Sequence, residues 1–484
     1  MGAAIVVLLL AFAFRVRNLG AESAWMDEAY SIALAGFPLD KIIQGTAADQ
    51  HPPLYYLLLH LWMLPGSGVF FARFLSLLIG IINIAQVMAL GRRLGGSAIG
   101  GGVGLLLAIS PFHVWYSQEA RMYILLATFT TAATTELWLC LQGRKRWLLY
   151  TLFCLFSLYT QYFALFIFIA HGLLVVLQAA RSRRLMFLGQ WTKAMLAVAL
   201  GFGVWLPVAL NQMRFHMMPW IGRPDIGSIR DALLALFWGN EAMGVPTGIR
   251  WLAFAGLGIM ILWGVFKLYR RRPANWSGFE LIAFWALIPF FLIVLTSLYY
   301  PIFQTKQFLL LVGAFVLLFT FIVQLLPRPA GVLLLFVSLL FAGASVLLQQ
   351  SILHKDDWRG AAQYIQQGYG PGDVVYSNPA ASALALSLYA PSQFVYDGYP
   401  PDYSILSGGW KNGQTITPQI ADTAMQLQVR QHTRIWLVES YPQLWDPSGA
   451  LESWLSVHAF LAADKQFTNV RVRLYQLRPE SPQP

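Results

Sequence analysis

Apolar residues form eleven runs along the chain, and most of them approach the length of a membrane span. A bilayer-spanning helix needs about 20 mainly apolar residues. The runs lie near 3–14, 69–90, 98–114, 124–141, 147–159, 163–180, 191–210, 251–269, 278–298, 308–326 and 331–348. They predict an all-α polytopic membrane bundle of about eleven transmembrane helices. The first run is short, so a cleaved signal peptide ending near Ala13 is an alternative for it.

Basic residues gather in alternate loops between these runs. Such loops face the cytoplasm by the positive-inside rule. The loops in question carry Arg92 and Arg93; Arg144, Lys145 and Arg146; Arg181, Arg183 and Arg184; Arg270, Arg271 and Arg272; and Arg328. Three longer segments, 15–68, 211–250 and everything after about 349, are then expected on the extracytoplasmic side.

The overall composition agrees with a membrane protein. Only 11% of the residues are charged, against about 25% in soluble domains. The net charge of +11 follows from the basic loops, so it predicts no nucleic-acid partner. Cys140 and Cys154 both lie in apolar runs, which argues against a disulfide-stapled scaffold.

The last part of the chain changes composition abruptly. We expect two domains, a membrane domain over 1–350 with the outer loop 15–68, and a soluble extracytoplasmic domain over 351–484. In the tail, 358–367 is typical of a helix, Thr417 and Pro418 begin another, and 373–376, 435–438 and 470–474 are typical of strands. This order predicts a small α/β domain.

Two adjacent carboxylates lie in the first outer loop, where 25–30 leads into a short helical stretch. Neighbouring residues on a helix point about 100° apart, so Asp27 and Glu28 do not both face one cleft. At most one of them acts in catalysis. The alternative is that both lie at the N-terminus of a surface helix, where carboxylates are favoured.

The same loop continues through His51, Pro52 and Pro53. Pro52 holds His51 extended, and Pro53 is suited to begin a helix. The amides of Leu54 and Tyr55 then form a candidate anion site beside His51. Alternatively, the two prolines only turn the chain before an interfacial helix anchored by aromatic residues.

Charged residues on two short outer loops need partners, because unpaired charge near a membrane is costly. Glu119 and Arg121 are two positions apart and do not face each other on a helix. Arg15 and Arg17 lie just outside the first run, where they could pair with Glu119, bind an anion or extend to the interface. Lys306 is placed to meet a phosphate.

With these residues assembled, the chain resembles the protein-mannosyltransferase-like branch of the GT-C glycosyltransferases, specifically bacterial glycosyltransferase family 39-like proteins. The resemblance extends to about residue 373 and is dense only to 163. It rests on Asp27-Glu28, Asp49-Gln50-His51-Pro52-Pro53-Leu54, Ser110-Pro111, Gln118-Glu119-Ala120-Arg121-Met122-Tyr123, Tyr159-Thr160-Gln161-Tyr162-Phe163 and Asp356-Asp357-Trp358-Arg359.

The resemblance implies an inverting transfer of a monosaccharide from a polyprenyl-phosphate-linked donor to a protein, lipid or glycan acceptor. It implies that Asp27 is the catalytic acid residue and that His51 lies in a loop lining the same cavity. The candidate catalytic residues are Asp27, Glu28 and Glu119, and the candidate donor-binding residues are His51, Arg121, Lys306 and Tyr55.

Some features leave alternatives open. Many relatives are expected to have an Arg or His followed by an aromatic residue where this chain has Lys306 and Gln307. No cofactor is required; the carboxylates would suit a divalent metal, but no ligand cluster demands one. A multi-spanning transporter or lipid flippase is the alternative function, and a scaffold displaying the tail is a third.

Overall fold

A computed structural model describes residues 2–215, 221–239, 245–271, 276–352, 355–390, 392–401, 403–407 and 415–478. The chain forms two compact units. The membrane unit comprises Met1–Leu19, Gln50–Tyr55 and Arg73–Ile352, and the sheet unit comprises Gly20–Asp49, Tyr56–Ala72 and Leu353–Pro484. Most of the outer loop 15–68 therefore groups with the tail by its contacts, whereas the sequence assigned it to the membrane domain.

Every predicted run contains helix. Eight described helices are long and apolar enough to cross a membrane, and a ninth span is formed if a bent pair counts as one. The eight are α5 (Val69–Gly95), α8 (Tyr123–Leu141), α10 (Ala164–Ser182), α11 (Leu185–Phe202), α14 (Thr247–Arg271), α15 (Trp276–Tyr299), η2 (Thr305–Leu311) with α16 (Val312–Val323), and α17 (Arg328–Gln349). The shorter α1 (Gly2–Val16) and α9 (Trp147–Thr160) are also apolar. The chain is an integral membrane protein, and the number eleven stays a prediction.

One span differs from its predicted position. The helix expected over 191–210 begins at Leu185 and ends at Phe202, and α12 (Leu206–Phe215) follows separately. Arg183 ends α10 in a left-handed conformation with φ 52°, so the chain turns within two residues and α11 starts early.

The bent pair, α6 (Ser97–Ala108) and α7 (Pro111–Ser117), turns by 62°. Arg15 is completely buried and donates to the carbonyls of Ala11, Leu107 and Ala108 at 2.8–2.9 Å. It also contacts His113 Nδ1 at 2.9 Å and Ser117 Oγ at 3.3 Å. These contacts occupy all five guanidinium N–H groups. Arg15 therefore stabilises the bend, and it has no donor left for an anion or for Glu119.

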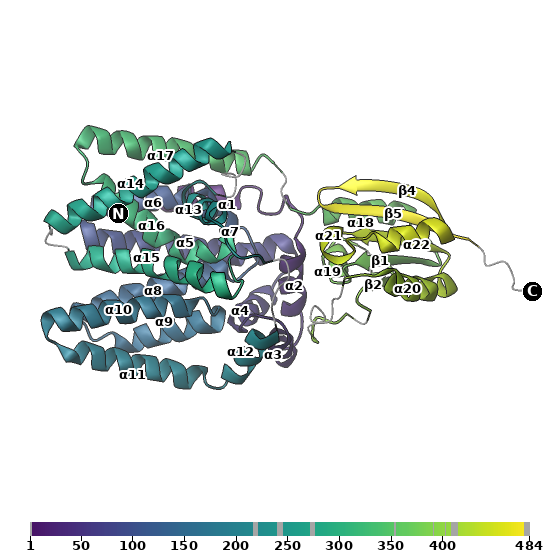
Figure 1. Cartoon of the computed structure of the whole chain (residues 1–484), viewed down its shortest axis with the longest axis horizontal. Helices are drawn as coiled ribbons and strands as arrows, with labels where there is room; N and C mark the ends of the chain where they lie inside the picture. Colours follow the sequence, from purple (N-terminus) through teal and green to yellow (C-terminus); the bar gives the residue numbers. More distant parts are fainter. Residues whose placement is uncertain are drawn as a thin grey trace, which may run out of the picture. The chain divides into compact units, whose positions relative to one another are not determined.

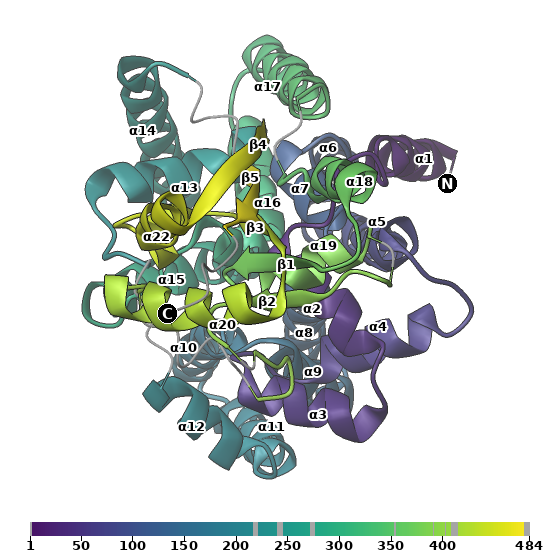
Figure 2. The same cartoon turned by 90° about the vertical axis from the view of Figure 1, so that its right-hand side faces the viewer.

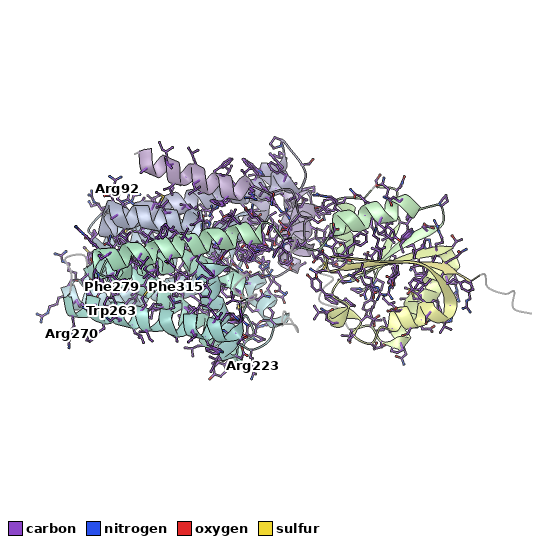
Figure 3. All side chains as sticks on the ribbon, turned by 90° about the horizontal axis from the view of Figure 1, so that it is seen from above. Arg92, Arg223, Trp263, Arg270, Phe279 and Phe315 are labelled. Carbon is purple, nitrogen blue, oxygen red and sulfur yellow. The ribbon has the colours of Figure 1, made fainter. Side chains whose placement is uncertain are left out.

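Charged residues mark the two ends of the membrane unit. Figure 3 shows Arg92 of α5 and Arg270 of α14 at one end of the helices and Arg223 at the other. Two ion pairs formed by other basic loops also involve helix residues, Arg146 with Glu136 and Arg181 with Glu280. Arg272, from the same set of basic loops, lies outside the described residues.

The sheet unit contains one five-stranded mixed sheet of order β2-β1-β3-β5-β4. β1 pairs in parallel with β2 and β3, whereas β5 is antiparallel to β3 and β4. The strands are β1 (Asp373–Asn378), β2 (Tyr396–Gly398), β3 (Arg434–Glu439), β4 (Ala459–Phe467) and β5 (Val470–Leu477). The predicted strands are confirmed, while β2 and β4 were not predicted.

Helices cover both faces of this sheet, with α18 (Trp358–Gly368) and α19 (Ser382–Ser387) on one face and α20 (Pro418–Gln431) and α22 (Ala450–His458) on the other (Figures 1 and 2). Successive side chains of a strand point to opposite faces of the sheet, so the strands contribute residues to the hydrophobic cores on both faces. Val375 and Trp436 face one core, and Val374 and Ile435 face the other. The small α/β tail is thus confirmed.

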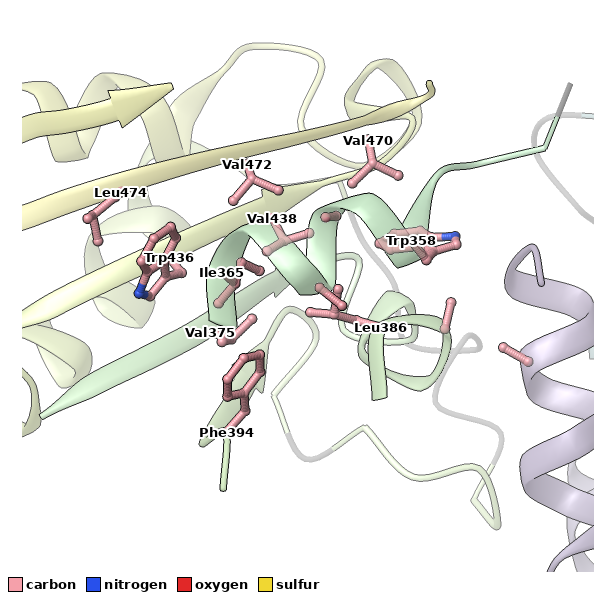
Figure 4. Close-up of a cluster of buried hydrophobic side chains, with 14 residues drawn as sticks. Trp358, Ile365, Val375, Leu386, Phe394, Trp436, Val438, Val470, Val472 and Leu474 are labelled. Carbon is pink, nitrogen blue, oxygen red and sulfur yellow. The ribbon is translucent and has the colours of Figure 1, made fainter. Parts of the chain in front are cut away.

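One of these cores also receives a helix from the outer loop. Trp358, Ile365, Leu386 and Trp436 meet in it (Figure 4), together with Ala29 of α2 (Met26–Ala35). The remaining described helices are α3 (Leu39–Ala48), α4 (Leu54–Met63), α13 (Ile226–Trp238) and α21 (Pro442–Trp445). Apolar burial thus holds α2 against the tail.

Candidate active site

Asp27 and Glu28 lie in the first turn of α2, as the sequence predicts. The structure gives them different surroundings. Glu28 is fully buried, and its Oε2 atom lies 3.0 Å from Nζ of Lys355, whose side chain is 7% exposed. Asp27 is partly exposed. Because neighbouring helix residues diverge by about 100°, the pairing of Glu28 directs Asp27 to a different side of α2.

A second carboxyl group accompanies Asp27 in the sheet unit. Asp356 is buried and accepts a 2.9 Å hydrogen bond from the Tyr441 hydroxyl. Burial raises the pKa of Asp356, the charge of Asp27 raises it further, and the hydrogen bond from Tyr441 opposes the rise. The charge of Asp27 thus acts on the Asp356 carboxyl.

Tyr441 reaches Asp356 because of its backbone position. It follows the end of β3 by two residues and adopts a left-handed conformation with φ 53°. Burial raises the pKa of Tyr441, and the charges of Asp356 and Asp27 add to this effect, so Tyr441 stays a neutral donor near pH 7. The sequence drew attention to Asp356 only as part of a family motif, and it gave no sign of Tyr441.

Three predicted donor-binding residues, His51, Arg121 and Lys306, meet in the membrane unit. Nη2 of Arg121 lies 3.1 Å from Nε2 of His51. Since a guanidinium can only donate, His51 Nε2 accepts. Arg121 and Lys306 also lie over the Tyr123 ring, at 5.9 and 5.5 Å from its centroid, within cation–π range. Residues from three separate loops thus form one basic cluster.

Local structure explains how Arg121 reaches this cluster. Ser110 caps α7 by accepting from the His113 amide, and the chain turns after Ser117 before α8 begins at Tyr123. Gln118 fastens that turn by donating to the carbonyls of Arg15 and Arg17 at 2.9 and 2.7 Å. Arg121 is thereby presented from a short, anchored turn.

Lys306 lies in the first turn of η2, and the residue after it is held by a buried hydrogen bond. Gln161 Nε2 donates to Gln307 Oε1 at 2.7 Å. Gln161 belongs to the motif 159–163, which carried the family resemblance without an assigned role. The pairing gives a physical reason for Gln307, at the position where an aromatic residue was expected.

The other two predicted site residues are buried. Tyr55 is in the first turn of α4 with its side chain inaccessible to solvent. Glu119 lies in the turn before α8, where its carbonyl accepts from the Arg121 amide at 2.8 Å. Glu119 therefore helps to shape the turn that carries Arg121.

The described residues include no group of three or more His, Cys, Asp or Glu side chains arranged to hold a metal ion. Their chemistry is that of carboxyl groups on α2 and at the start of the tail, and of cations around Tyr123. A carboxylate can accept a proton, and clustered cations can stabilise an oxyanion.

The sequence matches no protein-family model and no curated protein sequence. Its structure, in contrast, is similar to solved structures. One is apo ArnT from Cupriavidus metallidurans, with a TM-score of 0.63 and 15% identity over 98% of this chain and 97% of that chain. ArnT bound to undecaprenyl phosphate is also similar, with a TM-score of 0.62 and 14% identity over 97% of each chain.

A third solved structure is the archaeal oligosaccharyltransferase AglB from Archaeoglobus fulgidus, in complex with an inhibitory peptide and a dolichol-phosphate. Its TM-score is 0.56 at 10% identity, over 98% of this chain and 74% of that chain. Identities this low carry information on fold alone. Together with the apolar spans and the mixed sheet, these similarities confirm the fold that the resemblance implied, a GT-C-like membrane fold with a small C-terminal sheet.

Proposed function

We propose that this protein is an inverting glycosyltransferase that moves a monosaccharide from a polyprenyl-phosphate-linked donor to an extracytoplasmic acceptor. The observation that carries the proposal is the basic cluster of His51, Arg121 and Lys306 around Tyr123. The cluster gathers positive charge from separate segments of the chain, and clustered cations can stabilise the charge of the phosphate of a lipid-linked donor. The similar ArnT structure bound to undecaprenyl phosphate supports this choice of ligand.

The proposed reaction divides the work between the two groups of residues. Asp27 accepts the proton of the acceptor hydroxyl while the hydroxyl oxygen attacks the anomeric carbon of the donor sugar. The bond from that carbon to the phosphate oxygen breaks, and the phosphate leaves with the electron pair. His51, Arg121 and Lys306 stabilise its charge. Attack on the face opposite the phosphate inverts the anomeric centre.

Donor consumption tests the proposal directly. We expect purified protein, incubated with a panel of polyprenyl-phosphate sugars and candidate acceptors, to release polyprenyl phosphate from one of them. Product analysis should then give the opposite anomeric configuration. If an intact labelled donor instead moves from one leaflet of a vesicle membrane to the other without loss of its sugar, the flippase alternative is favoured.

Removal of single side chains from the basic cluster should weaken use of the donor. We expect His51→Ala or Arg121→Ala to raise the KM for the donor by about 10- to 100-fold, because hydrogen bonds to charged groups contribute about 1.5–3 kcal/mol. The measurement is initial rate against donor concentration at equal protein in the membrane. Arg92→Ala, at an exposed arginine of the basic loops, is the matched control. Loss of both variants from the membrane would indicate a structural role.

Asp27→Asn should slow the chemical step. Asparagine keeps the shape and hydrogen bonding of the side chain but does not take up the proton. We expect kcat to fall by about 100- to 10,000-fold, the range for lost acid–base catalysis, while the donor still binds. Asp40→Asn, at an exposed acid of α3, is the control. Near-normal turnover of Asp27→Asn would remove Asp27 from the mechanism and make Glu28 or Glu119 the next candidate.

We also propose that the basic loops are cytoplasmic and the tail is extracytoplasmic. The charge bias supports this orientation. An impermeant maleimide should label Leu427→Cys, at a half-exposed position of α20, in intact cells. It should label Lys145→Cys, which is exposed, only after permeabilisation. The two native cysteines are buried, so labelling of the unsubstituted protein measures the background. Labelling of Lys145→Cys in intact cells contradicts the orientation.

A further inference from the structure

The start of the tail holds the segment that carries Asp27 through a series of direct contacts. Arg359 donates from Nη2 to the carbonyl of Gly20 at 3.0 Å and from Nη1 to that of Ala21 at 3.2 Å. Its amide donates to Ser23 Oγ at 3.1 Å. The Lys355 amide donates to Glu22 Oε1 at 3.3 Å. These contacts fix the backbone immediately before α2.

Tyr389, two residues after the end of α19, provides a further attachment. Its hydroxyl accepts from the Ala24 amide at 2.7 Å, and its ring lies 5.3 Å from the Arg359 guanidinium carbon. Ala29, one turn into α2, is buried in the core that contains Trp358. Segment 20–29 is therefore attached along its length to 355–359 and to Tyr389.

The ion pair between Lys355 and Glu28 sets the rotation of α2. Both side chains are almost removed from solvent, at 7% and 0% exposed, with 3.0 Å between Nζ and Oε2. A buried carboxylate that loses its partner is strongly unfavourable, so Glu28 has little freedom to turn away. Because Asp27 precedes Glu28 on the same helix, its direction is then determined as well.

The charge of Asp27 acts on the tail residue that follows Lys355. It adds to the effect of burial, which raises the pKa of Asp356. Tyr441 holds the Asp356 carboxyl through a 2.9 Å hydrogen bond. Two consecutive tail residues thus interact with the two consecutive acids of α2: Lys355 forms an ion pair with Glu28, and Asp356 feels the charge of Asp27.

We propose that Lys355 is a positioning residue for the reaction: through its ion pair with Glu28 it holds α2 in the rotation that directs Asp27 at the acceptor hydroxyl. This role rests on the proposed function of Asp27. It makes the soluble tail a working part of the enzyme, because the tail supplies the partner of Glu28. Glu28 itself is assigned to this ion pair and takes no proton from the acceptor.

Turnover of charge variants tests this role. We expect Lys355→Gln to lower kcat by about 10- to 100-fold, the scale of a misplacement of about 1 Å, with the donor KM within about twofold of wild type. The exchange Glu28→Lys with Lys355→Glu should recover part of the lost kcat, because it restores opposite charges. Lys41→Gln, at an exposed lysine of α3, is the matched control. An exchange variant no more active than Lys355→Gln contradicts the proposal.

Amide hydrogen exchange gives a readout that does not depend on activity. In Lys355→Gln the amides of Met26–Ala35 should exchange about 10-fold faster or more, while those of β3 keep the wild-type rate. Unchanged exchange in α2 overturns the positioning role, whether or not a donor has been found. A wild-type protein that consumes no donor overturns the proposed function instead.

If Lys355→Gln does not accumulate in the membrane, Arg359→Gln tests whether the attachment of the tail to the segment before α2 contributes to the same positioning. It removes the contacts to the carbonyls of Gly20 and Ala21 but leaves the buried ion pair intact. We expect faster exchange at the start of α2 and a lower kcat at unchanged donor KM. Wild-type values for both quantities would contradict the role of segment 355–359.

Discussion

The backbone carbonyl groups at the end of α6 have no partner within the helix and must accept hydrogen bonds from elsewhere. The packing of the membrane unit depends on how this requirement is met. No water is present in a bilayer core to satisfy backbone polar groups, so a break in a spanning helix needs a partner from the protein. Arg15 supplies it, with donors to Leu107 and Ala108. The same guanidinium contacts His113, which contacts Asn83 at 3.1 Å. A cation at the end of one helix thus allows another to bend.

The basic cluster follows from that bend. Once α7 turns by 62° and ends at Ser117, the loop to α8 is short, and Gln118 anchors it to the carbonyls that end α1. Arg121 from this loop contacts His51 and lies over the Tyr123 ring. Cations held this way are preorganised, and preorganised charge stabilises a leaving phosphate more effectively than charge that must first reorient.

In the sheet unit, the two acids of α2 are positioned by packing and by an ion pair. Apolar burial of Ala29 holds the helix against the tail, and the buried pair of Glu28 with Lys355 determines its rotation. Burial of one acid therefore directs its neighbour. Adjacent carboxylates in a loop are ambiguous as catalysts, and the buried ion pair of Glu28 is the reason that Asp27 is the acid chosen in the proposed function.

The sequence alone determined the membrane class, the positions of most spans, the strands of the tail and the set of polar residues worth examining. Each of these depends on a local rule: the thickness of the bilayer, the alternation along a strand, or the cost of charge near lipid. The early start of α11 was missed because it depends on a two-residue turn at Arg183.

Only the tertiary structure decided which partner each polar residue has. Arg15 was equally compatible with an anion, the interface or Glu119, until its five donors were accounted for. Glu28 and Lys355 are separated by 327 positions, and neither residue's neighbours in sequence indicate the pairing. Periodicity reports the environment of a residue. The identity of its partner depends on how distant segments pack, and no local pattern carries that information.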